Sequence, residues 1–138
     1  MRFFLDASFV VALELTNDNK HGAARSFWNE LDEKNAHFVT TGFVLAEILA
    51  YLNGFGLHRK SAEVGNWLLF NPAVELVIPG RREIVDGYDY LVRHRDKRYL
   101  VTDCLSFILM RKMRLDAALT FDRHFAQAGF AMLPEEKA

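Results

Sequence analysis

The chain has 138 residues, of which 51% are apolar and 25% are charged, and its formal net charge is −1. These values lie near the averages of globular proteins, so they exclude a disordered or collagen-like chain, and the length favours a single domain over residues 1–138. The small net charge argues against a protein that coats nucleic acid, but it does not exclude a nuclease, because bound metal ions bring positive charge locally.

Neither a membrane anchor nor a secretion signal is expected. The longest apolar run, residues 7–13, is far shorter than the roughly 20 residues of a membrane-spanning helix. Asp6 interrupts the apolar start of the chain, where a signal peptide would continue. Cys104 is the one cysteine, so no internal disulfide can form. We therefore expect a cytoplasmic protein that does not bind membranes.

The first half of the chain is predicted to hold two strands and three helices. A short buried strand at residues 3–5 precedes an apolar helix over residues 8–15 and an amphipathic helix over residues 20–34. Residues 38–40 form a second strand, and residues 43–52 form a helix with leucine and isoleucine at core spacing.

The middle of the chain continues this alternation. Residues 60–70 and 82–94 are predicted to be helical, and residues 74–78 form a strand between them. A loop follows that carries the basic residues of segment 93–98. This segment is a candidate for binding RNA phosphates, with a solvated surface as the alternative.

The last third is predicted to begin with a helix over residues 103–114. Thr102 is its expected N-cap, because threonine accepts a hydrogen bond from the first turn. Strands at residues 117–121 and 130–133 flank a short turn or helix at residues 122–127. Strands and helices thus alternate throughout. This order predicts an α/β fold, a three-layer α/β/α sandwich with helices on both faces of a mostly parallel central sheet.

Three aspartates occupy positions that matter in such a sheet. Asp6 and Asp122 each follow a predicted strand directly, and ligands bind at the carboxyl ends of parallel strands, near the point where strand order reverses. Asp103 lies at a helix N-terminus, where the helix dipole favours negative charge. Each has a plainer alternative, since a single aspartate after a strand is most often a turn former or a cap.

Glu47 is the only charged residue in the helix over residues 43–52. A helix that is apolar all round is normally buried, and a buried carboxylate needs a partner, a proton or a metal ion. No lysine or arginine lies within one turn of Glu47. We therefore expect this carboxylate to be buried, either in a metal site or paired with a residue distant in sequence.

Together the four acids predict one metal-binding pocket. Clustered carboxylates repel each other unless a cation or a proton neutralises them. An all-oxygen ligand set favours Mg²⁺ or Mn²⁺ over zinc. Such a site suits phosphodiester hydrolysis, because the ion activates a water and offsets the charge of the phosphate. The candidate catalytic and metal-binding residues are Asp6, Glu47, Asp103 and Asp122.

Hydroxyl residues accompany these acids in the sequence. They are candidates for orienting the carboxylates or metal-bound waters, with a cap or a satisfied core hydroxyl as the alternative for each. They are Ser8, Thr102, Ser106 and Thr120.

Aromatic residues are frequent on the helices between the first and third predicted strands. We expect them in the core, with a dimer interface or a partner groove as the alternative. They are Phe27, Trp28, Tyr51, Phe55, Trp67 and Phe70.

Four segments, in their order and spacing, resemble the PIN-domain ribonucleases, and most of all the VapC-type toxins of toxin–antitoxin pairs. They are residues 5–8 (LDAS), 44–47 (VLAE), 102–107 (TDCLSF) and 119–125 (LTFDRHF). The resemblance implies a PIN-like fold and a metal-dependent endoribonuclease that hydrolyses RNA phosphodiester bonds. It also implies a homodimer, and an antitoxin protein that covers the active-site groove.

The resemblance carries the acidic quartet of the family onto the four acids, and its hydroxyl positions onto Ser8, Thr102 and Ser106. It leaves open whether Asp122 binds the metal directly or through water. Phe125 is interpreted as a core residue, and His124 as structural, with a phosphate contact as the alternative.

Two other functions compete with the ribonuclease. One is a non-catalytic PIN-like binding module that uses the acidic pocket for docking, which a complete acidic quartet disfavours. The other is a DNA-directed nuclease, because hydrolysis of this kind does not require the 2′-hydroxyl of RNA.

Overall fold

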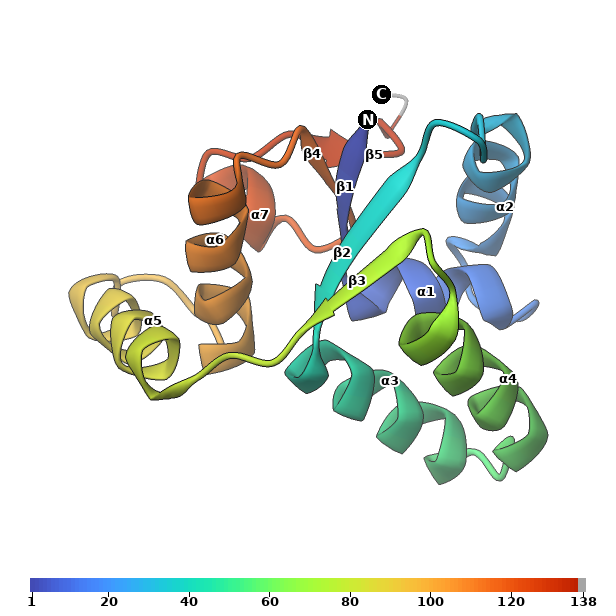
Figure 1. The fold of residues 1–138 in the computed structure, drawn as a ribbon, viewed down its shortest axis with the longest axis horizontal. Helices are drawn as coiled ribbons and strands as arrows, with labels where there is room; N and C mark the ends of the chain where they lie inside the picture. The colour runs from blue at the N-terminus through green and yellow to red at the C-terminus, as the bar shows by residue number, and fades with distance from the viewer. Residues whose placement is uncertain (137–138) are drawn as a thin grey trace.

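The computed structural model describes residues 1–136, and its centre is a five-stranded sheet in which every strand pair is parallel. The strand order is β3-β2-β1-β4-β5 (Figure 1). The strands are β1 (Arg2–Leu5), β2 (His37–Thr41), β3 (Val74–Val77), β4 (Ala117–Leu119) and β5 (Met132–Leu133). The predicted α/β class is confirmed, and the sheet is wholly rather than mostly parallel.

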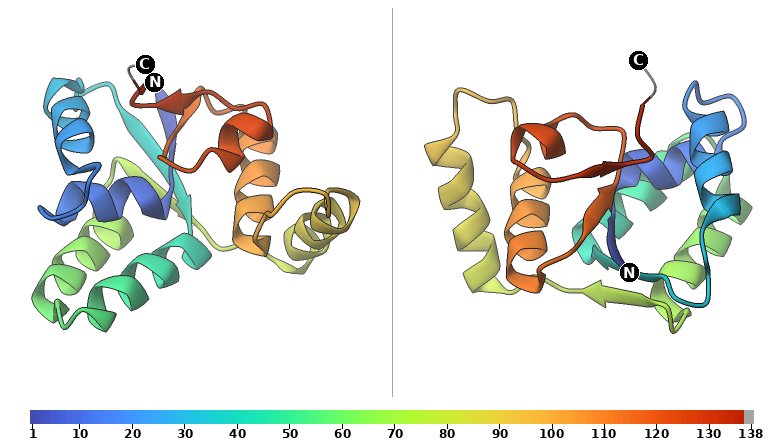
Figure 2. Two further views of the ribbon diagram at one scale, coloured as in Figure 1. Left: turned by 180° about the vertical axis from the view of Figure 1, so that it is seen from behind. Right: turned by 90° about the horizontal axis from the view of Figure 1, so that it is seen from above.

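Helices cover both faces of this sheet. The helices α1 to α4 lie on one face and α5 to α7 on the other (Figures 1 and 2). They are α1 (Ala7–Glu14), α2 (His21–Glu30), α3 (Gly42–Gly54), α4 (His58–Phe70), α5 (Arg81–Arg93), α6 (Val101–Met113) and α7 (His124–Gln127). Right-handed crossovers explain this division, because the chain moves outward from β1 to β3 and then returns to build β4 and β5 on the other side. Strand order therefore reverses between β1 and β4.

The core is apolar and rich in aromatic rings. Phe3 and Phe4 of β1 are fully buried and contact rings from opposite faces, since Phe3 stacks on Phe38 and Phe4 packs on Phe125. Trp28 and Trp67 meet edge to face between α2 and α4, with their ring centroids 5.6 Å apart. These contacts confirm the core interpretation of Phe125 and of both tryptophans.

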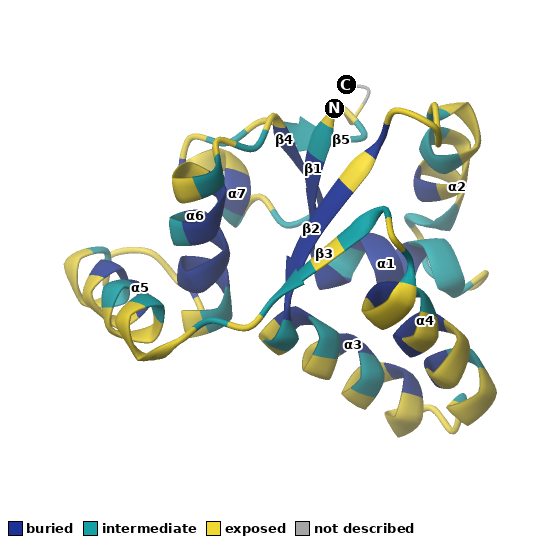
Figure 3. Cartoon of the chain, in the orientation of Figure 1, coloured by how far each residue is buried: buried dark blue, intermediate teal, exposed yellow. Residues whose placement is uncertain are grey.

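Other aromatic residues predicted to be in the core are exposed instead. Phe55 and Phe70 are 65% and 74% exposed, and Tyr51 on α3 is 45% exposed. Phe55 lies just beyond the end of α3 and Phe70 is the last residue of α4. The ends of α3 and α4 are coloured as exposed in Figure 3.

Two of the helix boundaries that differ from the prediction have a cause that the structure shows. The helix α2 ends at Glu30 rather than near residue 34, because the Asp32 carboxylate accepts hydrogen bonds from the Lys34 amide and the Asn35 side chain and so stabilises a turn. The helix α6 begins at Val101 with Leu100 as its N-cap, so Thr102 lies inside the first turn. The N-cap prediction for Thr102 is therefore wrong.

Within residues 1–136, no helix has both the length and the apolar character needed to cross a bilayer.

Candidate metal and active site

The strand ends bring two of the predicted acids together. Asp6 follows β1 directly, and its amide donates to the Leu119 carbonyl over 3.1 Å, which completes the last pair of β1 with β4, Leu5 with Leu119. Asp122 follows the end of β4 by three residues. Both carboxylates therefore lie at the carboxyl edge of the sheet, at the place where strand order reverses.

All four predicted acids line a single cavity of about 430 Å³. Asp103 reaches it from the first turn of α6, and Glu47 from α3. The remaining wall includes Tyr51, Leu100 and Phe121. The structure thus brings together four carboxylates that come from four separate parts of the chain.

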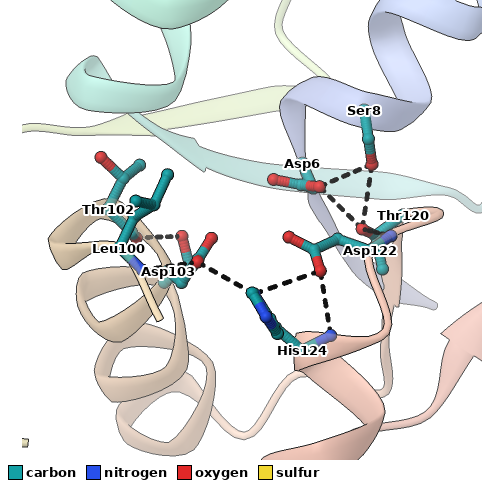
Figure 4. A network of polar contacts seen from close by, with 9 residues as sticks. Asp6, Ser8, Leu100, Thr102, Asp103, Thr120, Asp122 and His124 are labelled. Carbon is teal, nitrogen blue, oxygen red and sulfur yellow. Dashed lines mark hydrogen bonds and ion pairs between the residues drawn. The ribbon is translucent and has the colours of Figure 1, made fainter. Parts of the chain in front are cut away.

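Asp6 is held by two hydroxyl groups (Figure 4). Its Oδ2 accepts hydrogen bonds from Ser8 Oγ and from Thr120 Oγ1, each over 2.7 Å. Each hydroxyl has one hydrogen and donates it to Asp6. The two hydroxyl oxygens lie 3.1 Å apart, but no hydrogen is left to form a hydrogen bond between them. The hydroxyl oxygens accept in turn from the Phe121 and Asp122 amides. The network fixes the orientation of the Asp6 carboxylate.

The predicted hydroxyl residues therefore fall into two groups. Ser8 and Thr120 contact a carboxylate directly. Ser106 Oγ donates to the Thr102 carbonyl over 2.9 Å, one turn back in the same helix. Within the described residues, the side chains of Thr102 and Ser106 make no hydrogen bond to any of the four acids.

Asp103 combines a structural and an electrostatic role. Its Oδ2 accepts a hydrogen bond from the Leu100 amide over 2.9 Å, so it satisfies a free N–H group at the start of α6. Burial raises the pKa of Asp103, the nearby Asp122 carboxylate raises it further, and the Leu100 hydrogen bond opposes the shift. Burial likewise raises the pKa of Asp6, against the lowering effect of its two hydroxyl partners.

Glu47 lies beside the other acids, but it is not buried as the sequence predicted. The helix α3 buries Val44, Ile48 and Leu52, whereas Glu47 is on an exposed face with Phe43 and Tyr51. The prediction assumed that an apolar helix is covered on all sides, and no element within residues 1–136 packs on this face. Partial desolvation raises the pKa of Glu47, and the carboxylates of Asp6, Asp103 and Asp122 add to the shift.

His124 is the residue whose place in the site the sequence reasoning missed. Its Nδ1 lies 3.3 Å from Asp122 Oδ1 and 3.4 Å from Asp103 Oδ2. One ligand atom from each of these three residues falls within 4.8 Å of the others. The available signal was the spacing Asp122-Arg123-His124, which places an imidazole two residues after an acid at a strand end.

The electrostatics of the cavity fit a divalent cation. Among residues 1–136, no lysine or arginine forms an ion pair with any of the four acids. Lys20 lines the cavity, but its ammonium group pairs with Glu136 over 2.9 Å. Raised pKa values and repelling carboxylates are what an anionic pocket shows before a cation neutralises it. The oxygen-rich ligand set suits Mg²⁺ or Mn²⁺.

Comparison with known proteins finds a matching family and a curated relative. The sequence profile of the PIN domain matches residues 3–131. A curated relative, the 23S rRNA-specific endonuclease VapC20 of Mycobacterium tuberculosis, is 33% identical over 134 residues, which cover 96% of this chain and 98% of the relative.

Solved structures show the same fold. The crystal structure of Mycobacterium tuberculosis VapC20, described as a Sarcin-Ricin loop cleaving toxin, superposes with a TM-score of 0.84 at 29% identity and covers 94% of this chain and 96% of that one. A toxin–antitoxin complex from Klebsiella pneumoniae superposes with a TM-score of 0.68 at 9% identity, covers 98% of this chain and 99% of that one, and supports the fold alone.

Proposed function

The chain belongs to the PIN-domain family, and on this basis we propose that it is a metal-dependent endoribonuclease that hydrolyses RNA phosphodiester bonds as the toxin of a toxin–antitoxin pair. The observation that carries the metal dependence is the convergence of four carboxylates in one cavity without a lysine or arginine partner among the described residues. Such a cluster is costly unless a cation binds to it or a proton neutralises part of its charge.

Each acid has a distinct part in this proposal. Asp6, Asp103 and Asp122 hold Mg²⁺ or Mn²⁺ at the sheet edge, and Glu47 completes the acidic wall from α3. Ser8 and Thr120 position Asp6 by occupying its Oδ2. When bound, the ion supplies positive charge for the scissile phosphate and lowers the pKa of a bound water.

The proposed substrate is a structured RNA. The VapC20 relative is named for its action on 23S rRNA, and its solved structure is described as that of a toxin which cleaves the Sarcin-Ricin loop. In this chain, Arg95, Lys97 and Arg98 are exposed in the loop that leads to Leu100 at the cavity wall. We expect them to contact phosphates of an RNA that enters the cavity.

An antitoxin is the proposed protein partner. The fold neighbour from Klebsiella pneumoniae is a toxin–antitoxin complex, and the acidic cavity suits a basic side chain from such a partner. An arginine or lysine in the cavity would neutralise the acids and keep the cation out. The predicted cytoplasmic location stays a prediction.

A homodimer is proposed from an apolar stripe on α5. Ile84, Val85, Tyr88 and Val92 follow each other at helical spacing, and each is at least 39% exposed. Apolar side chains gathered on one helix face favour an interface, and a second copy of the chain presents the same stripe.

RNA cleavage by purified Asp6→Asn and Asp103→Asn tests the function. We expect each to cleave more than about a hundredfold more slowly than the parent in Mn²⁺, because a metal ligand is weakened. Asp32→Asn is the matched control, since Asp32 lies in the loop before β2, at the other end of the strands. Cleavage by Asp103→Asn at the parental rate would refute the proposal.

Two further results separate the alternatives. Absence of Mn²⁺ binding by the parent protein in calorimetry would favour the non-catalytic binding module. Equal cleavage of a DNA and an RNA oligonucleotide of the same sequence would favour a DNA-directed nuclease.

A further inference from the structure

His124 carries a buried nitrogen without a hydrogen bond. Within the part of the chain that the structure describes, its Nδ1 is the one buried side-chain nitrogen or oxygen with no partner. Buried polar atoms are nearly always hydrogen-bonded, so an exception of this kind calls for an explanation.

The nearest polar atoms to this nitrogen are carboxylate oxygens. Asp122 Oδ1 lies at 3.3 Å and Asp103 Oδ2 at 3.4 Å, and neither contact has hydrogen-bond geometry. Two atoms that ligate one divalent ion at about 2.1 Å each are separated by about 3.0–3.4 Å. The distances from the nitrogen to the two oxygens are therefore those expected between neighbouring ligands of one metal ion.

The ring is also held in place from the protein side. The His124 amide donates to Asp122 Oδ1 over 2.9 Å, which fixes the start of α7 relative to that acid. Tyr99 meets the imidazole edge to face at 5.2 Å between ring centroids. Figure 4 shows the imidazole directed toward the space between Asp103 and Asp122.

We propose that His124 Nδ1 is a direct ligand of the metal ion that Asp103 and Asp122 bind, and that this nitrogen makes the site prefer Mn²⁺ to Mg²⁺. The inference rests on the proposed metal-dependent function and adds a residue outside the acidic quartet. Mg²⁺ favours oxygen ligands, whereas first-row transition ions accept imidazole nitrogen together with carboxylates. A mixed nitrogen and oxygen site therefore discriminates between the two ions.

Pulsed electron paramagnetic resonance of the Mn²⁺-loaded full chain tests the ligand assignment. We expect modulation from a directly bound ¹⁴N nucleus in the parent protein, replaced by the ¹⁵N pattern when histidine is labelled. His124→Gln is expected to lose this signal while it still binds Mn²⁺. The matched control is His58→Gln, because His58 lies at the start of α4 and its Nδ1 contacts Asn53.

Calorimetry on the same proteins tests the preference. We expect His124→Gln to lower the ratio of Mn²⁺ to Mg²⁺ affinity by about tenfold or more, mainly through weaker Mn²⁺ binding. His58→Gln should leave the ratio unchanged. The nitrogen signal of the parent protein tests the ligand assignment by itself, so the test remains possible even if His124→Gln does not fold.

The outcomes distinguish this inference from the function on which it rests. Mn²⁺ bound by the parent without nitrogen coupling would overturn the role of His124 and leave the carboxylate site intact; the imidazole would then act only as a neighbour of the two acids. No Mn²⁺ binding at all would overturn both.

Discussion

The carboxylate of Asp6 and the hydroxyl of Thr120 lie 2.7 Å apart, although the two residues are 114 positions apart along the chain. This hydrogen bond joins the ends of β1 and β4, the neighbouring strands between which strand order reverses. It fixes one oxygen of Asp6 and so decides how the acid faces the cavity.

Thr120→Val is expected to weaken metal binding while it preserves the shape of the side chain. The substitution removes the hydroxyl that donates to Asp6 and accepts from the Asp122 amide. We expect about a tenfold loss of Mn²⁺ affinity in calorimetry, with a loss of about 1–3 kcal/mol in the free energy of unfolding because buried polar groups lose their partner. Unchanged Mn²⁺ affinity would show that Asp6 does not depend on this contact. Thr16→Val, at an exposed position beyond α1, is the control.

Stability without metal is expected to depend on pH through Asp6. Burial raises the pKa of Asp6 above its ordinary value of 3.8. The folded protein therefore holds a proton that the unfolded chain has released, and stability falls as pH rises from about 4 through the raised pKa. Asp6→Asn has no proton to lose. In a chelator, it should be as stable as the parent near pH 4 and more stable by on the order of 1 kcal/mol at pH 8.

Thermal melts of both proteins across this pH range measure the effect. Added Mn²⁺ should reverse the order, because the parent gains stability from an ion that the variant binds weakly. A stability difference that stays constant with pH would contradict the burial of an ionisable Asp6.

Tyr88→Lys is expected to dissociate the proposed homodimer. Tyr88 is 61% exposed at the centre of the α5 stripe, and a lysine there would place two like charges in a self-complementary interface. We expect the dimer dissociation constant to rise about a hundredfold or more in sedimentation experiments. Asn66→Lys on the exposed side of α4 is the control for added charge. A parent protein that sediments as a monomer would rule out the dimer.

Arg98→Ala is expected to weaken RNA binding without changing metal binding. Arg98 is exposed in the loop before α6, and a phosphate contact depends strongly on salt. Loss of one such contact should reduce the slope of log affinity against log salt by about one. Lys34→Ala, an exposed cation near the amino ends of the strands, should leave the slope unchanged. If Arg98→Ala and the parent have the same slope, the basic loop is a solvated surface that does not contact RNA phosphates.

The fold was largely predictable because its signals are local. The apolar stretch at β1, the amphipathic pattern of α2 and the core spacing of leucine and isoleucine in α3 lie within single elements. Boundaries were less predictable where a side chain decides them. The turn that the Asp32 side chain stabilises ends α2 earlier than predicted. The hydrogen bond from the Leu100 amide to Asp103 places the start of α6 before Thr102.

By itself, the sequence determined the order of strands and helices and the positions of the four acids at strand ends and on helices, because alternation and helical periodicity act over a few residues. Only the tertiary structure decided that Glu47 lies on an exposed face and that the His124 nitrogen lies between two carboxylates. These outcomes depend on which faces of distant elements pack together, and that packing is the sum of long-range contacts which no single segment encodes.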